Sequence, residues 1–156
     1  MPQITPFLWF NGHAEEAATF YTSVFPNSAI GPISRPDPAG PALVVPFSLD
    51  GKAFLALNGG PQYTFTEATS FVISCNTQQE IDHYWNALTE GGTPSRCGWL
   101  KDRYGLSWQV VPAQMGALMS DPDPAKAQRV MAAMMQMDKL DIAALEAAKA
   151  GTTEAV

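Results

Sequence analysis

Charged residues and cysteines are both scarce in this sequence. Charged residues make up 15% of the 156 residues, and the 9 basic side chains are outnumbered by 15 acidic ones. Because binding to nucleic acid draws on clustered Lys and Arg, we expect no nucleic-acid partner. The two cysteines, Cys75 and Cys97, are too few for a disulfide framework. We therefore expect free thiols and a cytoplasmic protein.

Long hydrophobic runs are also missing. No apolar run approaches the roughly 20 residues that span a bilayer, and the first four residues carry no basic segment of the kind that begins a signal peptide. We expect no membrane partner. Hydrophobic residues still make up 46% of the chain, and a chain of this length buries about two thirds of its unfolded surface. The composition therefore predicts a globular protein with a substantial core.

The first part of the chain reads as a strand, a helix and a hairpin. The run Ile4–Phe10 predicts a strand that stops at Asn11-Gly12. Asp50-Gly51 predicts the turn of a hairpin between residues 42–49 and 52–58. Between these lies a helix whose apolar residues follow helical spacing: Ala14, Ala17, Ala18, Tyr21, Val24 and Phe25.

The same order then recurs. Phe71–Cys75 predicts a strand, Thr77 with Glu80 predicts a capping box at the start of a helix, and 106–111 predicts a later strand. A shift of 64 residues superimposes five positions of the two parts. They are Phe7 on Phe71, Glu16 on Glu80, Phe20 on Tyr84, Tyr21 on Trp85, and Val24 on Leu88. The repeat predicts an α+β domain at 1–112 made of two βαβββ units, at about 1–62 and 68–112.

The rest of the chain predicts a helical extension at 113–150, packed on the domain or on a dimer partner, and a flexible tail at 151–156. Asp123 precedes Pro124, as at the start of a helix. Asp141 predicts a second cap, with Leu140 and Leu145 as a hydrophobic staple. Four methionines in this region suit an interface between subunits: Met131, Met134, Met135 and Met137.

Three segments, 7–17 (FLWFNGHAEEA), 57–61 (LNGGP) and 97–112 (CGWLKDRYGLSWQVVP), resemble the vicinal oxygen chelate superfamily of glyoxalase I and bleomycin-resistance proteins. The similarity is to its PhnB-like subgroup, often labelled 3-demethylubiquinone-9 3-methyltransferase-like. The resemblance implies that the two units form a curved mixed sheet around a cavity and that the protein is a homodimer.

Enzymes of that superfamily hold a divalent ion with His, Glu or Gln side chains from strands of both units. A hard cation needs several oxygen ligands, and one neutral amide does not supply them, so we expect no metal and no cofactor. His13 and His83 lie on predicted helices, away from these strands. The matching positions here hold Thr5 or Pro6, residues 56–58, Ser70 or Phe71, and Gln109.

The predicted ligand-binding residues come from both units. Gln109 alternates with Ser107 and Val111, so these three share one side of a strand, and the resemblance makes that side the cavity. Trp9, Trp99 and Trp108 offer planar surfaces for stacking on a ligand, and we expect at least one of them to be plain core. The predicted set is Trp9, Asn58, Trp99, Ser107 and Gln109.

Three residues are candidates for chemistry. Cys97 has basic neighbours that would favour its thiolate, although a small residue filling a turn is the alternative. Lys101 and Asp102 could pair at the rim of the cavity, where Lys101 would receive an anionic or carbonyl group, or they could be an ordinary exposed pair. Cys75 ends an apolar strand and is expected to be inert core.

Three functions remain open. The first choice is a metal-independent protein that binds a small molecule. The second is an enzyme of the same fold, either a metal-dependent lyase or isomerase or a methyltransferase of the family label. The chain shows no Gly-rich turn between a strand and a helix of the kind that binds nucleotide-like cofactors. The third is a protein-interaction module that uses the Met-rich tail.

Overall fold

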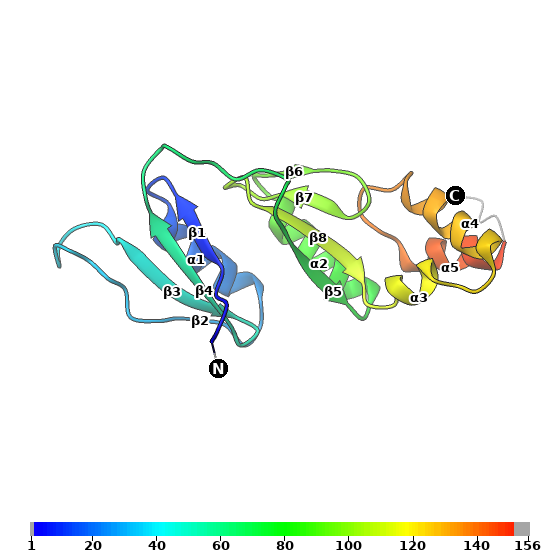
Figure 1. The fold of residues 1–156 in the computed structure, drawn as a ribbon, viewed down its shortest axis with the longest axis horizontal. Helices are drawn as coiled ribbons and strands as arrows, with labels where there is room; N and C mark the ends of the chain where they lie inside the picture. The colour runs from blue at the N-terminus through cyan, green and yellow to red at the C-terminus, as the bar shows by residue number, and fades with distance from the viewer. Residues whose placement is uncertain (1, 152–156) are drawn as a thin grey trace. The chain divides into compact units, whose positions relative to one another are not determined.

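The computed structural model describes residues 2–151 and divides them into two compact units between residues 65 and 66. The fold is α+β, as predicted, and each unit contains one four-stranded mixed sheet (Figure 1). Of the predicted flexible tail, 151–156, only Gly151 lies among the described residues. None of the helices within 2–151 is long and apolar enough to cross a membrane.

The first unit has the predicted βαβββ order. Its sheet runs β1-β4-β3-β2, with β1 parallel to β4 and the other neighbours antiparallel. The predicted hairpin turn is confirmed: Asp50 and Gly51 both have positive φ, 49° and 76°, which suits the tight turns that match strand twist. The elements are β1 (Phe7–Phe10), α1 (Ala14–Val24), β2 (Ala29–Ile30), β3 (Val44–Leu49) and β4 (Lys52–Asn58).

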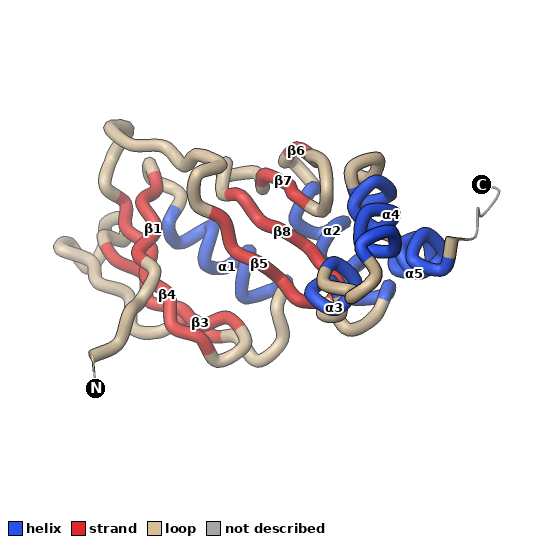
Figure 2. The backbone as a smooth tube through the Cα atoms, turned by 45° about the vertical axis from the view of Figure 1, so that its right-hand side comes forward, coloured by secondary structure: helices blue, strands red, loops and turns tan. Residues whose placement is uncertain are grey.

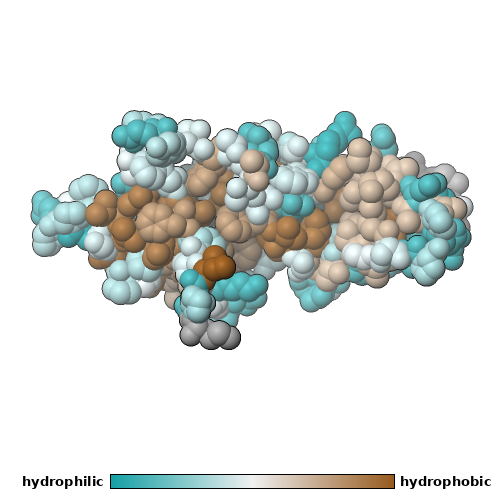
Figure 3. Space-filling view, in the orientation of Figure 1, coloured by the Kyte–Doolittle hydropathy of each residue, from teal (hydrophilic) through white to brown (hydrophobic). Residues whose placement is uncertain are grey.

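Helix α1 covers one face of this sheet. Tyr21 is fully buried and its ring stacks on that of Phe47 in β3, with centroids 6.1 Å apart. The other face carries side chains such as Phe7, which is 52% exposed, and the half-buried Leu55 and Leu57. Figure 3 shows hydrophobic side chains gathered over these strands. The unit therefore has one packed face and one open, apolar face.

The second unit repeats the order, and its sheet runs β5-β8-β7-β6. The predicted N-cap of α2 is confirmed, because the Glu80 backbone N–H donates to Thr77 Oγ1 at 3.1 Å. Helix α2 lies across one face of the sheet, where Trp85 is buried (Figure 2). The elements are β5 (Ser70–Cys75), α2 (Gln78–Thr89), β6 (Thr93–Pro94), β7 (Trp99–Lys101) and β8 (Ser107–Pro112).

The 64-residue shift holds for the helices and is wrong for the first strands. Tyr21 and Trp85 are both buried, as the shift requires. Phe7, however, lies on the open face of its sheet, whereas Phe71 pairs with the buried Trp108 on the face under α2. The turn from strand to helix has three residues in the first unit and two in the second. This one-residue difference turns the matched strand positions to opposite faces.

After β8 the chain is helical: α3 (Met115–Met119), α4 (Pro124–Met134) and α5 (Ile142–Ala150). The predicted caps are confirmed, since Asp123 accepts from Ala125 N at 3.0 Å and Asp141 from Ala144 N at 3.0 Å. The predicted staple residues both lie in the buried cluster between these helices. That cluster comprises Leu118, Val130, Leu140 and Leu145.

One side chain of α2 holds this helical region against α2. Gln78 Nε2 donates to Leu140 O at 3.0 Å, and Gln78 Oε1 accepts from Ile142 N at 2.9 Å. Beside it, Lys139 Nζ lies 2.9 Å from Asp82 Oδ1. The start of α5 is thus fixed to α2 by an amide with both ends bonded and by an ion pair.

Candidate functional site

The sheet of the second unit has one face covered by α2 and one open face. Along β8, Trp108 and Val110 are buried, 3% and 0% exposed, on the covered side. Gln109 and Val111 alternate with them and are half-buried on the open side. On this open side, Val111 packs against the helical region after β8, and the part around Ser107 lines a pocket.

A row of polar side chains crosses all four strands on this open face. Thr93 in β6 pairs with Lys101 in β7, and Lys101 pairs with Ser107 in β8. Ser107 pairs in turn with Ser70 in β5. Residues that are directly opposite in a sheet point to the same face. The sheet thus places one ammonium group in a line of hydroxyl groups, which we call the polar row.

The next row on the same face is less polar. Trp99 pairs with Gln109, and Gln109 pairs with Val72 in β5. At the other end, the Ser95 backbone N–H donates to Trp99 O at 2.9 Å. The half-buried Trp99 ring therefore lies beside the polar row and offers a flat apolar surface.

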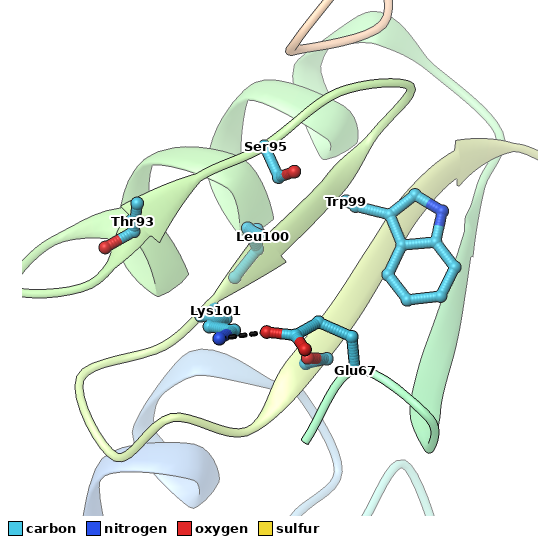
Figure 4. Close-up of a pocket in the computed structure, with 7 residues that line it drawn as sticks. Glu67, Thr93, Ser95, Trp99, Leu100 and Lys101 are labelled. Carbon is cyan, nitrogen blue, oxygen red and sulfur yellow. Dashed lines mark ion pairs between the residues drawn. The ribbon is translucent and has the colours of Figure 1, made fainter. Parts of the chain in front are cut away.

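A pocket of about 360 Å³ lies over the part of these rows formed by β6, β7 and the start of β8. This volume is at the small end of the range for ligand sites, roughly 300–1,000 Å³. Figure 4 shows Glu67 and Lys101 pointing toward one another across it, with the Trp99 ring at one side. The lining residues are Glu67, Thr93, Ser95, Trp99, Leu100, Lys101 and Ser107.

Lys101 and Glu67 form an ion pair at this pocket. Glu67 precedes β5 and is exposed, whereas Lys101 is held by the ladder of β7. The hydrogen bond from Lys101, a bond from the Glu67 backbone N–H and the Lys101 charge lower the pKa of the Glu67 carboxyl below its usual value. Glu67 is therefore ionised near neutral pH, and the pocket holds one charge of each sign.

Ser107 is the most deeply buried polar side chain of the pocket. It is 1% exposed, and its Oγ has no hydrogen-bond partner within residues 2–151. Leaving a buried hydroxyl without a partner costs about 1–3 kcal/mol. Such a group in the wall of a pocket is a free donor and acceptor for a bound molecule.

Asp102 has a structural role instead of the predicted place at the rim. It is 3% exposed, and its Oδ1 accepts from the backbone N–H groups of Tyr104 and Leu106 at 2.8 and 3.1 Å. Its Oδ2 accepts from Trp108 Nε1 at 2.9 Å. The sequence suggested an ion pair between Lys101 and Asp102; Lys101 pairs with Glu67, and the carboxylate of Asp102 holds the turn between β7 and β8.

Gln109 lies on the predicted face, in the same row as Trp99, but it does not line the pocket. Its Nε2 donates to Ser70 Oγ at 3.0 Å. Ser70 is the end of the polar row, so Gln109 orients that hydroxyl. Trp108, by contrast, is the plain core residue expected among the three candidate tryptophans.

Cys97 packs against the helical region after β8. It has a positive φ of 61°, and its backbone N–H donates to Met137 O at 2.8 Å. Its Sγ lies 3.8 Å from Met135 Sδ. Cys75 is fully buried, and desolvation, followed by the charge of Glu80, raises the pKa of its thiol to about 11. Neither cysteine lines the pocket described above.

The two remaining predicted residues lie in the first unit. Trp9 Nε1 donates to Gly60 O at 2.9 Å, and the ring covers Gly59 so closely that a Cβ there would lie 2.4 Å from it. Asn58 Oδ1 accepts from Ala14 N at 2.8 Å. The Asn58 Nδ2 donates to a backbone carbonyl at 2.9 Å. A second pocket, about 400 Å³, borders Asn58, whose amide is thus already used at both ends.

Within residues 2–151, no group of three or more His, Cys, Asp or Glu side chains lies together as a metal ion would need. The groups that the pocket does provide are three hydroxyls, one ammonium, one carboxylate and an indole ring.

Comparison with known proteins assigns the chain to a family. A family model described as 3-demethylubiquinone-9 3-methyltransferase matches residues 2–111. The chain belongs to this family. This match and a PhnB relative of known structure confirm the PhnB-like resemblance found in the sequence. The comparison with curated proteins gave no match.

Solved structures agree with the assignment. The PhnB protein from Bacillus cereus is 38% identical, with a TM-score of 0.65, over 70% of this chain and 99% of that one. A protein from Pseudomonas aeruginosa is 22% identical, with a TM-score of 0.61, over 72% and 98%. The fosfomycin resistance protein FosX from Mesorhizobium loti is 10% identical, with a TM-score of 0.54, over 70% and 89%. The last two show the fold alone.

Three of the residues named from the sequence line this pocket. They are Trp99, Lys101 and Ser107, which the sheet brings together. Glu67, Thr93 and Ser95 were not predicted from the sequence. No spacing links Glu67 to Lys101 across the intervening helix and strands. Thr93 in β6 and Ser95 directly after it follow the Gly91-Gly92 signal that ends α2, and strand pairing after that glycine turn is the clue that could have found them.

Proposed function

We propose that this protein binds a small organic molecule in the pocket over the polar row. Ser107 carries the proposal: its hydroxyl lines the pocket, is 1% exposed and has no hydrogen-bond partner among the described residues. Buried polar groups in folded proteins are almost always hydrogen-bonded. A ligand that bonds to Ser107 removes that cost and gains the surface of Trp99.

The neighbouring groups support this function. Lys101 supplies a charged donor at the centre of the row, and Gln109 keeps Ser70 oriented at its end. A pocket that combines an apolar wall with a few converging polar groups is typical of small-molecule sites. Trp9 and Asn58 bond within the other unit, and we assign them no part in this pocket.

The test is a screen of small aromatic and aliphatic fragments by two-dimensional NMR of the ¹⁵N-labelled protein. We expect binders to shift the backbone signals of Lys101 and Ser107 and the indole signal of Trp99. Ser107→Ala should weaken such binders about three- to tenfold while leaving stability equal or higher, because it removes an unsatisfied hydroxyl. Binders that shift none of these signals, or a screen without binders, would refute the proposal.

Methyl transfer to a demethylated quinol is the second candidate, and the description of the matching family favours it. It ranks second because neither strand-to-helix turn, Asn11-Gly12-His13 or Asn76-Thr77, is a Gly-rich loop of the kind that holds nucleotide-like cofactors. Incubation with S-adenosylmethionine and a demethylated quinol, followed by mass spectrometry of the quinol, tests it. A mass increase that depends on the protein would support this candidate.

We also infer that the protein forms a homodimer, as its family resemblance implied. Support comes from the end of helix α4, where Met131 in the helix and Met135 directly after it are 42% and 53% exposed. Exposed large apolar side chains that lie together are typical of interfaces. Light scattering after gel filtration gives the mass in solution, and a monomer at micromolar concentration would contradict the inference.

A further inference from the structure

The charged pair in the pocket carries an inference about the ligand, and it rests on the proposed function. Lys101 stands in the polar row between Thr93 and Ser107. Within residues 2–151, Glu67 is its carboxylate partner. An ammonium group offers three donors, and the hydroxyls beside it are donors as well. The chemistry of this end of the pocket therefore suits an acceptor with several lone pairs.

Glu67 is a partner that can leave. Its side chain is 60% exposed, and it lies on the turn before β5 instead of on the ladder that fixes Lys101. The turn itself is held by hydrogen bonds between residues close in sequence, such as that from Ala68 N to Thr66 Oγ1 at 3.3 Å. Exposed ion pairs contribute little to stability, so separating Glu67 from Lys101 costs little free energy.

Glu67 pairs with Lys101 but does not bond to the hydroxyl of Ser107 beside it, for which no partner is found among residues 2–151. The Glu67 carboxylate reaches Lys101 from outside the sheet, yet the hydroxyl of Ser107, directly paired with Lys101 in the ladder, has no hydrogen-bond partner among residues 2–151. An oxyanion that entered the pocket could accept from both groups at once. Charge-assisted bonds of this kind are stronger than those between neutral groups.

We propose that the ligand carries an oxyanion, such as a carboxylate, phosphate or sulfonate, joined to a flat apolar body, and that it displaces Glu67 from Lys101. Lys101 and Ser107 bind the oxyanion, and Trp99 contacts the apolar body. Glu67 is an internal competitor that occupies the ammonium while the pocket is empty. A tethered competitor acts at a high effective concentration, so it selects against ligands whose anionic group is weak or badly placed.

A matched pair of probes tests this. The first is 2-naphthoate and the second is its neutral analogue 2-naphthamide, each titrated into the full chain and followed by NMR. We expect 2-naphthoate to bind about tenfold more tightly than 2-naphthamide. On binding, the side-chain carboxyl ¹³C signal of Glu67 should move toward that of a free carboxylate.

Two substitutions separate the roles of the pair. Lys101→Gln should lower the affinity for 2-naphthoate about tenfold, to the level of 2-naphthamide. Glu67→Gln should raise the affinity for 2-naphthoate about two- to fivefold and leave 2-naphthamide unchanged. Asp82 and Lys139 form a similar exposed pair in the same unit, away from the pocket lining. Asp82→Asn and Lys139→Gln are therefore the matched controls, and we expect neither to change binding.

The outcomes distinguish the two proposals. Equal binding of both probes, or a Glu67→Gln variant that binds 2-naphthoate no better than the parent, overturns the oxyanion inference and leaves small-molecule binding intact. The inference also fails if neither probe binds at millimolar concentration while neutral fragments do. A pocket that takes neither the probes nor any fragment overturns the proposed function itself.

Discussion

Replacing Asp102 with asparagine is a direct test of the structural role given to this carboxylate. Its two oxygens accept from two backbone N–H groups and from the Trp108 indole, and the side chain is 3% exposed. Asparagine retains one oxygen. It can therefore satisfy the backbone donors or the indole, and its NH₂ group then faces a donor at the other position.

The expected loss of stability follows from these contacts. An unpaired buried donor costs about 1–3 kcal/mol, and loss of the charge from the remaining bonds adds about 1 kcal/mol. We expect the free energy of unfolding to fall by about 2–4 kcal/mol. With a urea dependence of about 2 kcal/mol per molar, the midpoint should drop by about 1–2 M.

Urea unfolding followed by circular dichroism measures this shift. Asp50→Asn is the control, because Asp50 lies exposed at the hairpin turn with a φ that asparagine also adopts. In a Trp108→Phe background the indole donor is gone, so Asp102→Asn should cost about half as much. A midpoint for Asp102→Asn within about 0.3 M of the parent would refute the structural role.

Two further predictions concern the second unit. With the pKa of the Cys75 thiol raised to about 11, a disulfide reagent at pH 8 should label the native protein at Cys97 alone and label Cys75 only after unfolding; rapid labelling of both would contradict the burial of Cys75. The bonds from Lys139 and then Gln78 lower the pKa of the Asp82 carboxyl, so its contribution to stability is present above the unfolded pKa near 3.8 and is lost as pH falls through the folded pKa. Asp82→Asn should therefore remove at most about 1 kcal/mol at pH 7 and flatten the acid limb of the stability curve, measured by urea unfolding from pH 2 to 7.

Local chemistry predicted most of the elements. The helix caps and the hairpin turn depend on contacts between residues within four positions of each other, which can be read directly from the sequence. They are the caps at Thr77, Asp123 and Asp141 and the turn at Asp50. The family resemblance implied a paired βαβββ fold, and each unit contains the four-stranded sheet that this fold requires.

Contacts between distant residues could not be predicted in the same way. The sequence places Lys101 next to Asp102, yet neighbouring residues on a strand point to opposite faces. Lys101 thus reaches Glu67 on the open face, and Asp102 turns to Trp108 on the covered side. Which carboxylate an ammonium group meets depends on strand register and turn geometry, and neither can be read from a single sequence.

The shorter turn before α2 has a consequence for any exchange of segments between the two halves of the chain. A chimera that swaps β1 and β5 by aligning the helices would place Phe7 at the position of Phe71, and an exposed side chain would be driven under α2. Shifting the crossover by one residue instead brings Phe7 onto Val72, and these two side chains are 52% and 56% exposed. The structural equivalence of the strands is therefore recovered at an offset of 65, from residue 7 to residue 72, and only that junction would keep each side chain on its own face of the sheet.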